Sequence, residues 1–222
     1  MNQEIWTAVD VFVTDTMIGP DEVQQETLRR NAAENLPAID VAPNQGKLLY
    51  LLAKIRNARR ILEIGTLGGY STIWLARALP PEGRLVTLEF SELHASVAAA
   101  NVAHAGFADR VEIRIGPALE SLVELAGEGE EAFDLIFLDA DKPNNPHYFE
   151  WAMRFSRPGT VIVGDNVVRD GEVANPDSTD ERVVGSRRLL ELMGSDDRIE
   201  STALQTVGVK GYDGFAIGMV KG

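Results

Sequence analysis

The sequence contains no cysteine, and this absence removes several kinds of chemistry at once. Without thiols the chain forms no disulfide and has no thiolate nucleophile or thiolate metal ligand. A bound metal ion would need oxygen or imidazole ligands. Only three histidines are present. His94 and His104 lie in an alanine-rich segment and are expected at the surface, and His147 has no suitably spaced partner, so none is expected to bind a metal.

The chain is also short of positive charge and of long apolar segments. Its 21 lysines and arginines face 34 aspartates and glutamates, which gives a net charge of -13. Nucleic acids and anionic membranes attract positively charged surfaces, so neither is expected as a partner. No run of about 18 apolar residues is present, and the first residues lack the basic start and apolar stretch of a signal peptide. We therefore expect a cytoplasmic protein.

What the sequence does contain is an alternation of short apolar segments with helical patterns. With 222 residues, 45% of them hydrophobic, the chain has the size and composition of a single folded domain. Such alternation predicts an α/β fold with a mostly parallel sheet covered by helices on both faces. Strands are expected at 59–65, 83–90, 110–116, 133–140 and 159–166. Helices are expected at 46–58, 70–79, 91–106, 117–127, 145–156 and 185–194.

The two ends of the chain depart from this alternation. The segments 199–208 and 213–220 are expected to pair as a hairpin that closes one edge of the sheet. Residues 1–40 are expected to form amphipathic helices outside the core sheet. The polar stretch 167–184 is longer than an ordinary connection, so it is either disordered or a functional loop, and we favour a loop over the site.

A glycine-rich turn follows the first core strand, in the segment "LEIGTLGGYS". Its glycines permit a tight turn and the close approach of a ligand, and the helix that follows offers free N–H groups. The turn lacks the G-x-G of dinucleotide sites, and Glu63 would repel a phosphate, so a pyrophosphate ligand is disfavoured. Glu89, at the end of the next strand, has the position of an acid that binds ribose hydroxyls. The simpler interpretation is a tight turn flanked by two surface acids.

Two groups of carboxylates follow neighbouring strands. Asp139 and Asp141 come after "DLIFL", and Asp165 and Asn166 come after "TVIVG". The carboxyl ends of parallel strands meet at one edge of the sheet, where ligands of such folds bind. Carboxylate and amide oxygens suit a hard divalent cation such as Mg²⁺, with Asp139, Asp165 and Asn166 as ligands. Lys142 lies beside them, and a nearby cation would favour its neutral form, which makes it a candidate base. The competing interpretation is a group of solvated ion pairs.

Five ordered motifs resemble those of the cation-dependent class I O-methyltransferases, the group of caffeoyl-CoA and catechol O-methyltransferases. They are "ILEIGTLGGYSTIWLARAL", "GRLVTLE", "RIGPAL", "FDLIFLDADKPNN" and "VIVGDN". The resemblance runs from about Ile39 to the C-terminus. It implies a Rossmann-like, seven-stranded sheet with an antiparallel last strand and S-adenosylmethionine as methyl donor. It also implies a divalent metal (Mg²⁺, Mn²⁺ or Ca²⁺), a vicinal diol or catechol as small-molecule acceptor, and a homodimer.

The resemblance assigns roles to individual positions. It implies cofactor contacts from Val41, Glu63, Gly65, Thr66, Ser71, Glu89, Ala118 and Asp141. In particular, Glu63 would face the methionine amine and Glu89 would bind the ribose. Asp139, Asp165 and Asn166 would bind the metal, and Lys142 would be the general base.

Two other kinds of function remain open from the residues. One is a nicotinamide-dependent oxidoreductase, and the other is a cofactor-binding module of the same fold without catalytic activity. A coenzyme A ester is not expected as acceptor, because the N-terminal segment is acidic where its phosphates would need basic residues. Asn144 is expected to cap the helix that follows it.

Overall fold

The computed structural model describes residues 2–222, which form one seven-stranded sheet flanked by helices. The strands lie in the order β3-β2-β1-β4-β5-β7-β6, and all pairs are parallel except the two that involve β7. The strands are β1 (Arg60–Ile64), β2 (Arg84–Glu89), β3 (Val111–Ile115), β4 (Leu135–Leu138), β5 (Val161–Asp165), β6 (Ile199–Gly208) and β7 (Gly211–Val220). The predicted parallel sheet with an antiparallel last strand is confirmed, and the terminal hairpin places β6 at one edge.

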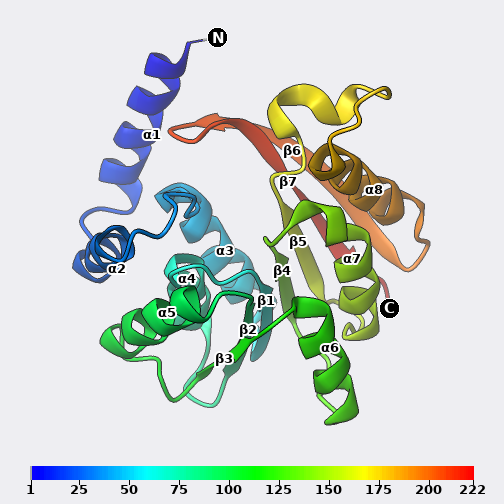
Figure 1. Ribbon diagram of the computed structural model, residues 1–222, viewed down its shortest axis with the longest axis horizontal. Coiled ribbons are helices and arrows are strands. Elements are labelled where there is room, and N and C mark those ends of the chain that lie inside the picture. Colours follow the sequence, from blue (N-terminus) through cyan, green and yellow to red (C-terminus); the bar gives the residue numbers. More distant parts are fainter. Residues whose placement is uncertain (1) are drawn as a thin grey trace.

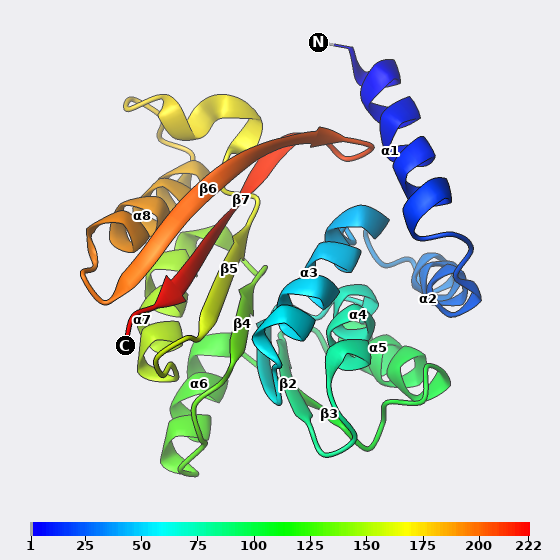
Figure 2. The ribbon, with the colours of Figure 1, turned by 180° about the vertical axis from the view of Figure 1, so that it is seen from behind.

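Helices cover both faces of this sheet (Figure 1). In chain order they are α1 (Gln3–Met17), α2 (Glu22–Ala33), α3 (Pro43–Arg56), α4 (Tyr70–Ala78), α5 (Glu92–His104), α6 (Ala118–Gly127), α7 (Asn145–Arg154) and α8 (Glu181–Ser195). Two short 3₁₀ segments, η1 (Lys142–Asn144) and η2 (Arg169–Ala174), follow β4 and β5. Figure 2 shows α3, α4 and α5 on one side of the strands and α6, α7 and α8 on the other.

Alternate side chains of each strand enter two separate cores. Leu62 and Ile64 of β1 belong to a cluster with apolar residues of α6, α7 and α8. Ile61 of the same strand belongs to a second cluster, with apolar residues of α3 and α4. Because side chains point to opposite faces in turn along a strand, each central strand contributes to both layers. This explains why apolar residues occupy adjacent positions in these strands.

Two helices begin earlier than the sequence predicted, and each start has a local cause. Pro43 occupies the first turn of α3, where a missing N–H has no cost. The α8 helix begins at Glu181, inside the predicted loop 167–184, because the side chain of Asp180 accepts a hydrogen bond from the backbone of Arg182. The rest of that loop contains η2 and is an ordered connection.

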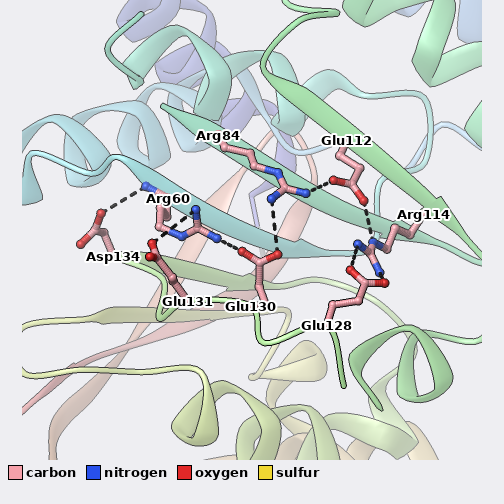
Figure 3. A network of polar contacts seen from close by, with 8 residues as sticks. All are labelled: Arg60, Arg84, Glu112, Arg114, Glu128, Glu130, Glu131 and Asp134. Atoms are coloured by element: carbon pink, nitrogen blue, oxygen red, sulfur yellow. Dashed lines mark hydrogen bonds and ion pairs between the residues drawn. The ribbon is translucent and has the colours of Figure 1, made fainter. Parts of the chain in front are cut away.

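The amino ends of the strands are held together by paired charges (Figure 3). Arg60 forms ion pairs with Glu130 and Glu131, and Arg84 with Glu112 and Glu130. The connection between α6 and β4 is thereby fixed to β1 and β2. The carboxylates at this edge each have a cationic partner, which leaves little tendency to bind a ligand there.

The first two helices lie outside the layers around the sheet, with α1 beside the tip of the β6–β7 hairpin (Figures 1 and 2). Gln3 donates a hydrogen bond to the carbonyl of Gly208 (2.9 Å), and Val209 donates one to Asp10 (2.7 Å). No residue of α1 is buried. Among residues 2–222, no helix combines the length and the apolar character needed to cross a membrane.

Candidate functional site

A cavity of about 810 Å³ opens along the carboxyl edge of the sheet, above β2, β1, β4 and β5. It brings together ten of the twelve residues that the sequence predicted for the site. These are Val41, Gly65, Thr66, Ser71, Glu89, Ala118, Asp139, Asp141, Lys142 and Asn166. The other two do not line this cavity: Glu63 is buried beneath the glycine turn, and Asp165 lines a neighbouring cavity. The prediction that distant segments converge at this edge is therefore confirmed in its geometry.

The glycine turn between β1 and α4 is built to pass close to β4. Gly65 has a φ of 103°, and a Cβ at this position would lie 2.2 Å from the carbonyl oxygen of Asp139. Any larger residue would push the two strand ends apart. Glu89 accepts hydrogen bonds from the backbone of Leu67 (2.8 Å) and Ser91 (2.9 Å), and so fixes the turn from the β2 side.

Glu63 is fully buried beneath this turn and does not line the cavity. Its carboxylate accepts hydrogen bonds from the hydroxyls of Ser71 (2.6 Å), Thr72 (2.5 Å) and Thr87 (2.7 Å). Burial raises the pKa of Glu63 to about 7, although the three hydroxyls oppose that shift. No cationic side chain among residues 2–222 forms an ion pair with Glu63. A positively charged ligand bound nearby would therefore balance the charge of this buried carboxylate. Ser71, which does line the cavity, connects the two.

A second group of acids, the buried Asp165 and the partly buried Asp139, lies where β4 and β5 end. Burial, together with the negative charge of Asp139, raises the pKa of Asp165 to about 7. Burial also raises the pKa of Asp139, although Lys142 opposes this from 2.9 Å (Nζ to Oδ1). Asn166 has a φ of 52°, and its backbone N–H bonds the carboxylate of Asp165 at 2.8 Å. The single positive charge of Lys142 does not balance both Asp139 and Asp165, so negative charge is left at this point when both carboxyl groups are ionised.

The residues present suit a hard divalent cation. Two carboxyl groups and the amide of Asn166 supply oxygen atoms only, the ligand type that such ions prefer. Residues 2–222 contain no group of three or more histidine, cysteine or acidic side chains that would form a different metal site. An ion would neutralise the excess charge of Asp139 and Asp165.

Another part of the cavity wall is formed by Asp141 and the two side chains that donate hydrogen bonds to it. Asp141 accepts hydrogen bonds from the phenol of Tyr148 (2.5 Å) and the amide of Asn144 (2.6 Å). Burial and the carboxylate of Asp141 raise the pKa of Tyr148, which keeps its proton as a donor. The prediction that the Asn144 side chain caps α7 is wrong. Asn144 stands at the N-cap position, but its amide is used by Asp141 instead.

A glycine of α8 sets the position of Lys142. A Cβ on Gly185 would lie 2.0 Å from the carbonyl oxygen of Lys142, so α8 packs directly on the backbone of η1. Lys142 itself is only 7% exposed. The segment that carries the candidate base is therefore held from behind by a helix that follows the long loop.

The sequence did not identify several polar residues that line the cavity, among them His94, Tyr148, Arg169 and Arg182. His94, which was expected at the surface and not as a metal ligand, also lines the cavity, because α5 starts at this edge and places its ring nitrogen 3.3 Å from Glu89. Position alone could have indicated His94, since it stands in the first turn after a strand end. The two arginines belong to the segment 167–184, as expected of a loop over the site.

A second cavity of about 420 Å³ lies on the other side of Asn166. It is lined by residues of α1, α3 and the β6–β7 hairpin together with Asp165 and Asn166. Gln45 of α3 lines this cavity together with Asp165. The pair Asp165–Asn166 thus stands between two cavities, one shared with the glycine turn and one bounded by the N-terminal helices.

Comparison with known proteins agrees with this geometry. Residues 16–215 match the model of the family described as O-methyltransferase. A catechol O-methyltransferase of Niastella koreensis is 49% identical over 221 residues, covering 100% of both chains. The crystal structure of the O-methyltransferase from Bacillus cereus in complex with SAH is 60% identical, with a TM-score of 0.97 over 98% of this chain and 99% of that chain. The O-methyltransferase TomG from Streptomyces achromogenes, in complex with SAM, is 49% identical, with a TM-score of 0.96 over the whole of both chains.

The contact between α8 and η1 predicts that Gly185→Ala is destabilising. The added methyl group overlaps the carbonyl of Lys142, so the free energy of unfolding should fall by about 1–3 kcal/mol. Gly194→Ala is the matched control, because it lies in the same helix with nothing within 4 Å of its added Cβ. That variant should be neutral or more stable by up to about 1 kcal/mol. Equal effects of the two changes in urea denaturation would contradict the packing assigned to Gly185.

The buried carboxyl group of Glu63 predicts a pH-dependent stability. Its pKa rises from 4.5 to about 7 on folding, so the native state retains a proton that the unfolded chain releases between these values. Its contribution is complete below about pH 4.5 and is lost as the pH rises to about 7. Glu63→Gln carries no charge, so relative to the parent protein it should gain about 1–3 kcal/mol between pH 5 and pH 8.

Thermal unfolding of both proteins without ligand measures this difference. Glu124→Gln, which changes an exposed carboxylate of α6, serves as the control and should follow the parent protein at every pH. A melting-temperature difference between Glu63→Gln and the parent that stays constant from pH 5 to pH 8 would show that Glu63 is not the titrating group.

Proposed function

The chain belongs to the O-methyltransferase family and is an S-adenosylmethionine-dependent O-methyltransferase, and we propose that it methylates one hydroxyl of a catechol-type small molecule with the help of a divalent cation. The observation that carries the proposal is the pair of carboxyl groups, the buried Asp165 and the partly buried Asp139, next to Asn166 and Lys142 at the cavity. Family membership favours methyl transfer over the nicotinamide-dependent oxidation considered from the sequence. Membership of a family of O-methyltransferases also favours an enzyme over a module that only binds the cofactor.

The part of the cavity above β1 and β2 suits S-adenosylmethionine. Gly65 and Thr66 offer backbone groups at the turn, and Glu89 at the end of β2 offers a carboxylate to the ribose hydroxyls. The cationic end of the cofactor would lie toward Ser71 and the buried charge of Glu63. Val41, Ala118 and Asp141 complete the proposed binding surface. S-adenosylmethionine, when bound, supplies the methyl group on a positively charged sulfur.

The other part of the cavity suits the acceptor. Asp139, Asp165 and Asn166 would hold the divalent cation, which when bound lowers the pKa of an acceptor hydroxyl. A vicinal diol offers two adjacent oxygens, which matches a set of protein ligands that leaves coordination positions free. This is the basis for proposing a catechol over a single phenol.

Lys142 is proposed to accept the proton of the reacting hydroxyl. Its Nζ lies 2.9 Å from Asp139, so the amine is oriented by one of the proposed metal ligands. Burial of the amine, together with the packing of Gly185 against its backbone, limits the directions in which it can act. The oxygen left by deprotonation would form a bond to the methyl carbon of S-adenosylmethionine as the bond from that carbon to sulfur breaks, which would leave a neutral thioether. Both compounds would be held in one cavity, which Arg169 and Arg182 of the segment 167–184 help to line.

The first prediction of this proposal concerns the reaction itself. With S-adenosylmethionine and Mg²⁺, the protein should convert catechol to its monomethyl ether and leave resorcinol, whose hydroxyls are not adjacent, unchanged. Chelation of the metal and the variant Asp165→Ala should each abolish the reaction. Lys142→Ala should lower kcat by about 10²–10⁴, the usual contribution of a general base.

Product analysis by mass spectrometry measures each of these effects. Lys54→Ala, a change of an exposed lysine on α3, should leave the rate unaffected. Full activity in the presence of chelator, or in Asp165→Ala, would refute the role of the metal. Activity of Lys142→Ala close to that of Lys54→Ala would refute the role of the base.

A homodimer formed through α1 is the second part of the proposal. Ile5, Val9 and Phe12 are spaced along one face of this helix and are 56%, 53% and 68% exposed. An apolar stripe of this kind on a helix outside the core is typical of a surface that a partner covers. A second copy of the chain is the partner that the family resemblance implies.

The dimer proposal predicts the effect of a charge on this stripe. The parent protein should have twice the mass of the chain in light scattering coupled to size-exclusion chromatography, and Phe12→Glu should shift it to the monomer because a buried charge opposes association. Val123→Glu, at an exposed apolar residue of α6, is the control and should remain dimeric. A monomeric parent protein, or a dimer unaffected by Phe12→Glu, would contradict this surface.

A further inference from the structure

Arg169 occupies a turn that is held in an uncommon backbone conformation. It lies three residues after Asn166, at the start of η2, and has a φ of 56°. Such values are disfavoured for residues with a side chain and persist where the surroundings enforce them. The carboxylate of Asp213 in β7 does so here, since it accepts hydrogen bonds from the backbone of Val168 (2.9 Å) and Arg169 (3.0 Å). The result is an arginine side chain in the wall of the acceptor part of the cavity.

The guanidinium of Arg169 makes little use of its donors. Its contact with Asp213 is 3.7 Å from Nη1 to Oδ2, which is too long for a hydrogen bond. The Nε atom is buried and has no hydrogen-bond partner in the part of the chain that the structure describes. An arginine has five N–H donors, and a buried donor without an acceptor is unfavourable. The group therefore has donors available for a ligand.

Arg169 has only the long ion pair with Asp213, whereas the other lysine and arginine side chains of the cavity already donate hydrogen bonds to carboxylates. Lys142 bonds Asp139 at 2.9 Å. Arg182 donates two hydrogen bonds to Asp180, at 3.0 and 3.2 Å, and its side chain is 62% exposed. Arg169 is only 25% exposed, so its charge is less screened by water. Among these three cations, Arg169 is the one able to bind an anionic group.

We propose that Arg169 forms a subsite for a carboxylate substituent on the methyl acceptor, so that the preferred acceptor is a catechol that bears a carboxylic acid. This inference rests on the function proposed above, which places the diol of the acceptor at Asp165 and Asn166. Arg169 and Asn166 line the same cavity, so a ring held at Asn166 would present its far substituent to Arg169. A guanidinium matches a carboxylate in shape and charge, whereas it repels an ammonium group. The chain as a whole carries a net charge of -13, which does not attract anions. A preference for a carboxylate would therefore come from Arg169 itself.

The test compares two acceptors that differ only in charge. The affinities of 3,4-dihydroxybenzoate and its neutral amide are measured by isothermal titration calorimetry, with the full-length protein saturated with S-adenosylhomocysteine and Mg²⁺. The acid should bind at least about tenfold more tightly than the amide, as expected for one hydrogen-bonded ion pair. Arg169→Gln should weaken binding of the acid by about ten- to a hundredfold and leave that of the amide within about threefold. Arg169→Lys should retain part of the preference, because it keeps the charge but loses the fork of donors.

Arg188→Gln is the matched control, since Arg188 is exposed on α8, pairs with Glu191 and lies outside the cavity. It should bind both compounds as the parent protein does. The proposal is overturned if the parent binds acid and amide equally, if it binds neither, or if Arg169→Gln weakens both to the same extent. Methyl transfer to unsubstituted catechol, assayed separately, tests the proposed function. Failure of that reaction with Arg169-dependent binding of the acid would leave the subsite standing and refute the catalytic proposal.

Discussion

At one edge of the sheet the carboxyl groups of Glu63 and Asp165 are buried and that of Asp139 is partly buried, and Lys142 is the one buried lysine or arginine beside them among residues 2–222. Water solvates these charges poorly, so the pKa values of all three are raised. The excess negative charge is relieved by protonation or by a positively charged ligand. S-adenosylmethionine and the proposed divalent cation both carry positive charge, and each would meet that requirement.

The opposite edge of the same sheet shows that such charge is a property of the site and not of the fold. There Arg60 and Arg84 pair with glutamates that hold the connection between α6 and β4 (Figure 3). The ion pairs at the amino ends of the strands stabilise the strand order. The carboxyl ends, where acidic charge exceeds basic charge, form the proposed binding site. Close packing of backbone maintains the carboxyl edge, since Gly65 lies against Asp139 and Gly185 lies against Lys142. Larger side chains at these two positions would move the charged groups away from one another.

The acceptor side of the site is assembled from the parts of the chain that follow or precede the regular alternation. The turn at Arg169 depends on Asp213 of β7, and the second cavity depends on α1, α3 and the tip of the hairpin. These segments surround Asp165 and Asn166 without belonging to the strands that hold them. The cofactor side, in contrast, comes from β1, β2 and the helices that directly follow them. In the proposed function, cofactor binding and the choice of acceptor therefore depend on different parts of the sequence.

The sequence by itself determined the sheet, the glycine turn and the identity of the charged groups, because these follow from local patterns: apolar strands, glycines at a tight turn and acids at strand ends. It also placed ten of twelve candidate residues in one cavity, since parallel strands must end at the same edge. Only the tertiary structure decided what surrounds each group. Glu63 lies beneath Ser71 instead of in the cavity wall, Asn144 bonds Asp141 instead of capping α7, and His94 faces Glu89. These outcomes depend on contacts between segments far apart in the chain, and no spacing within one segment specifies them.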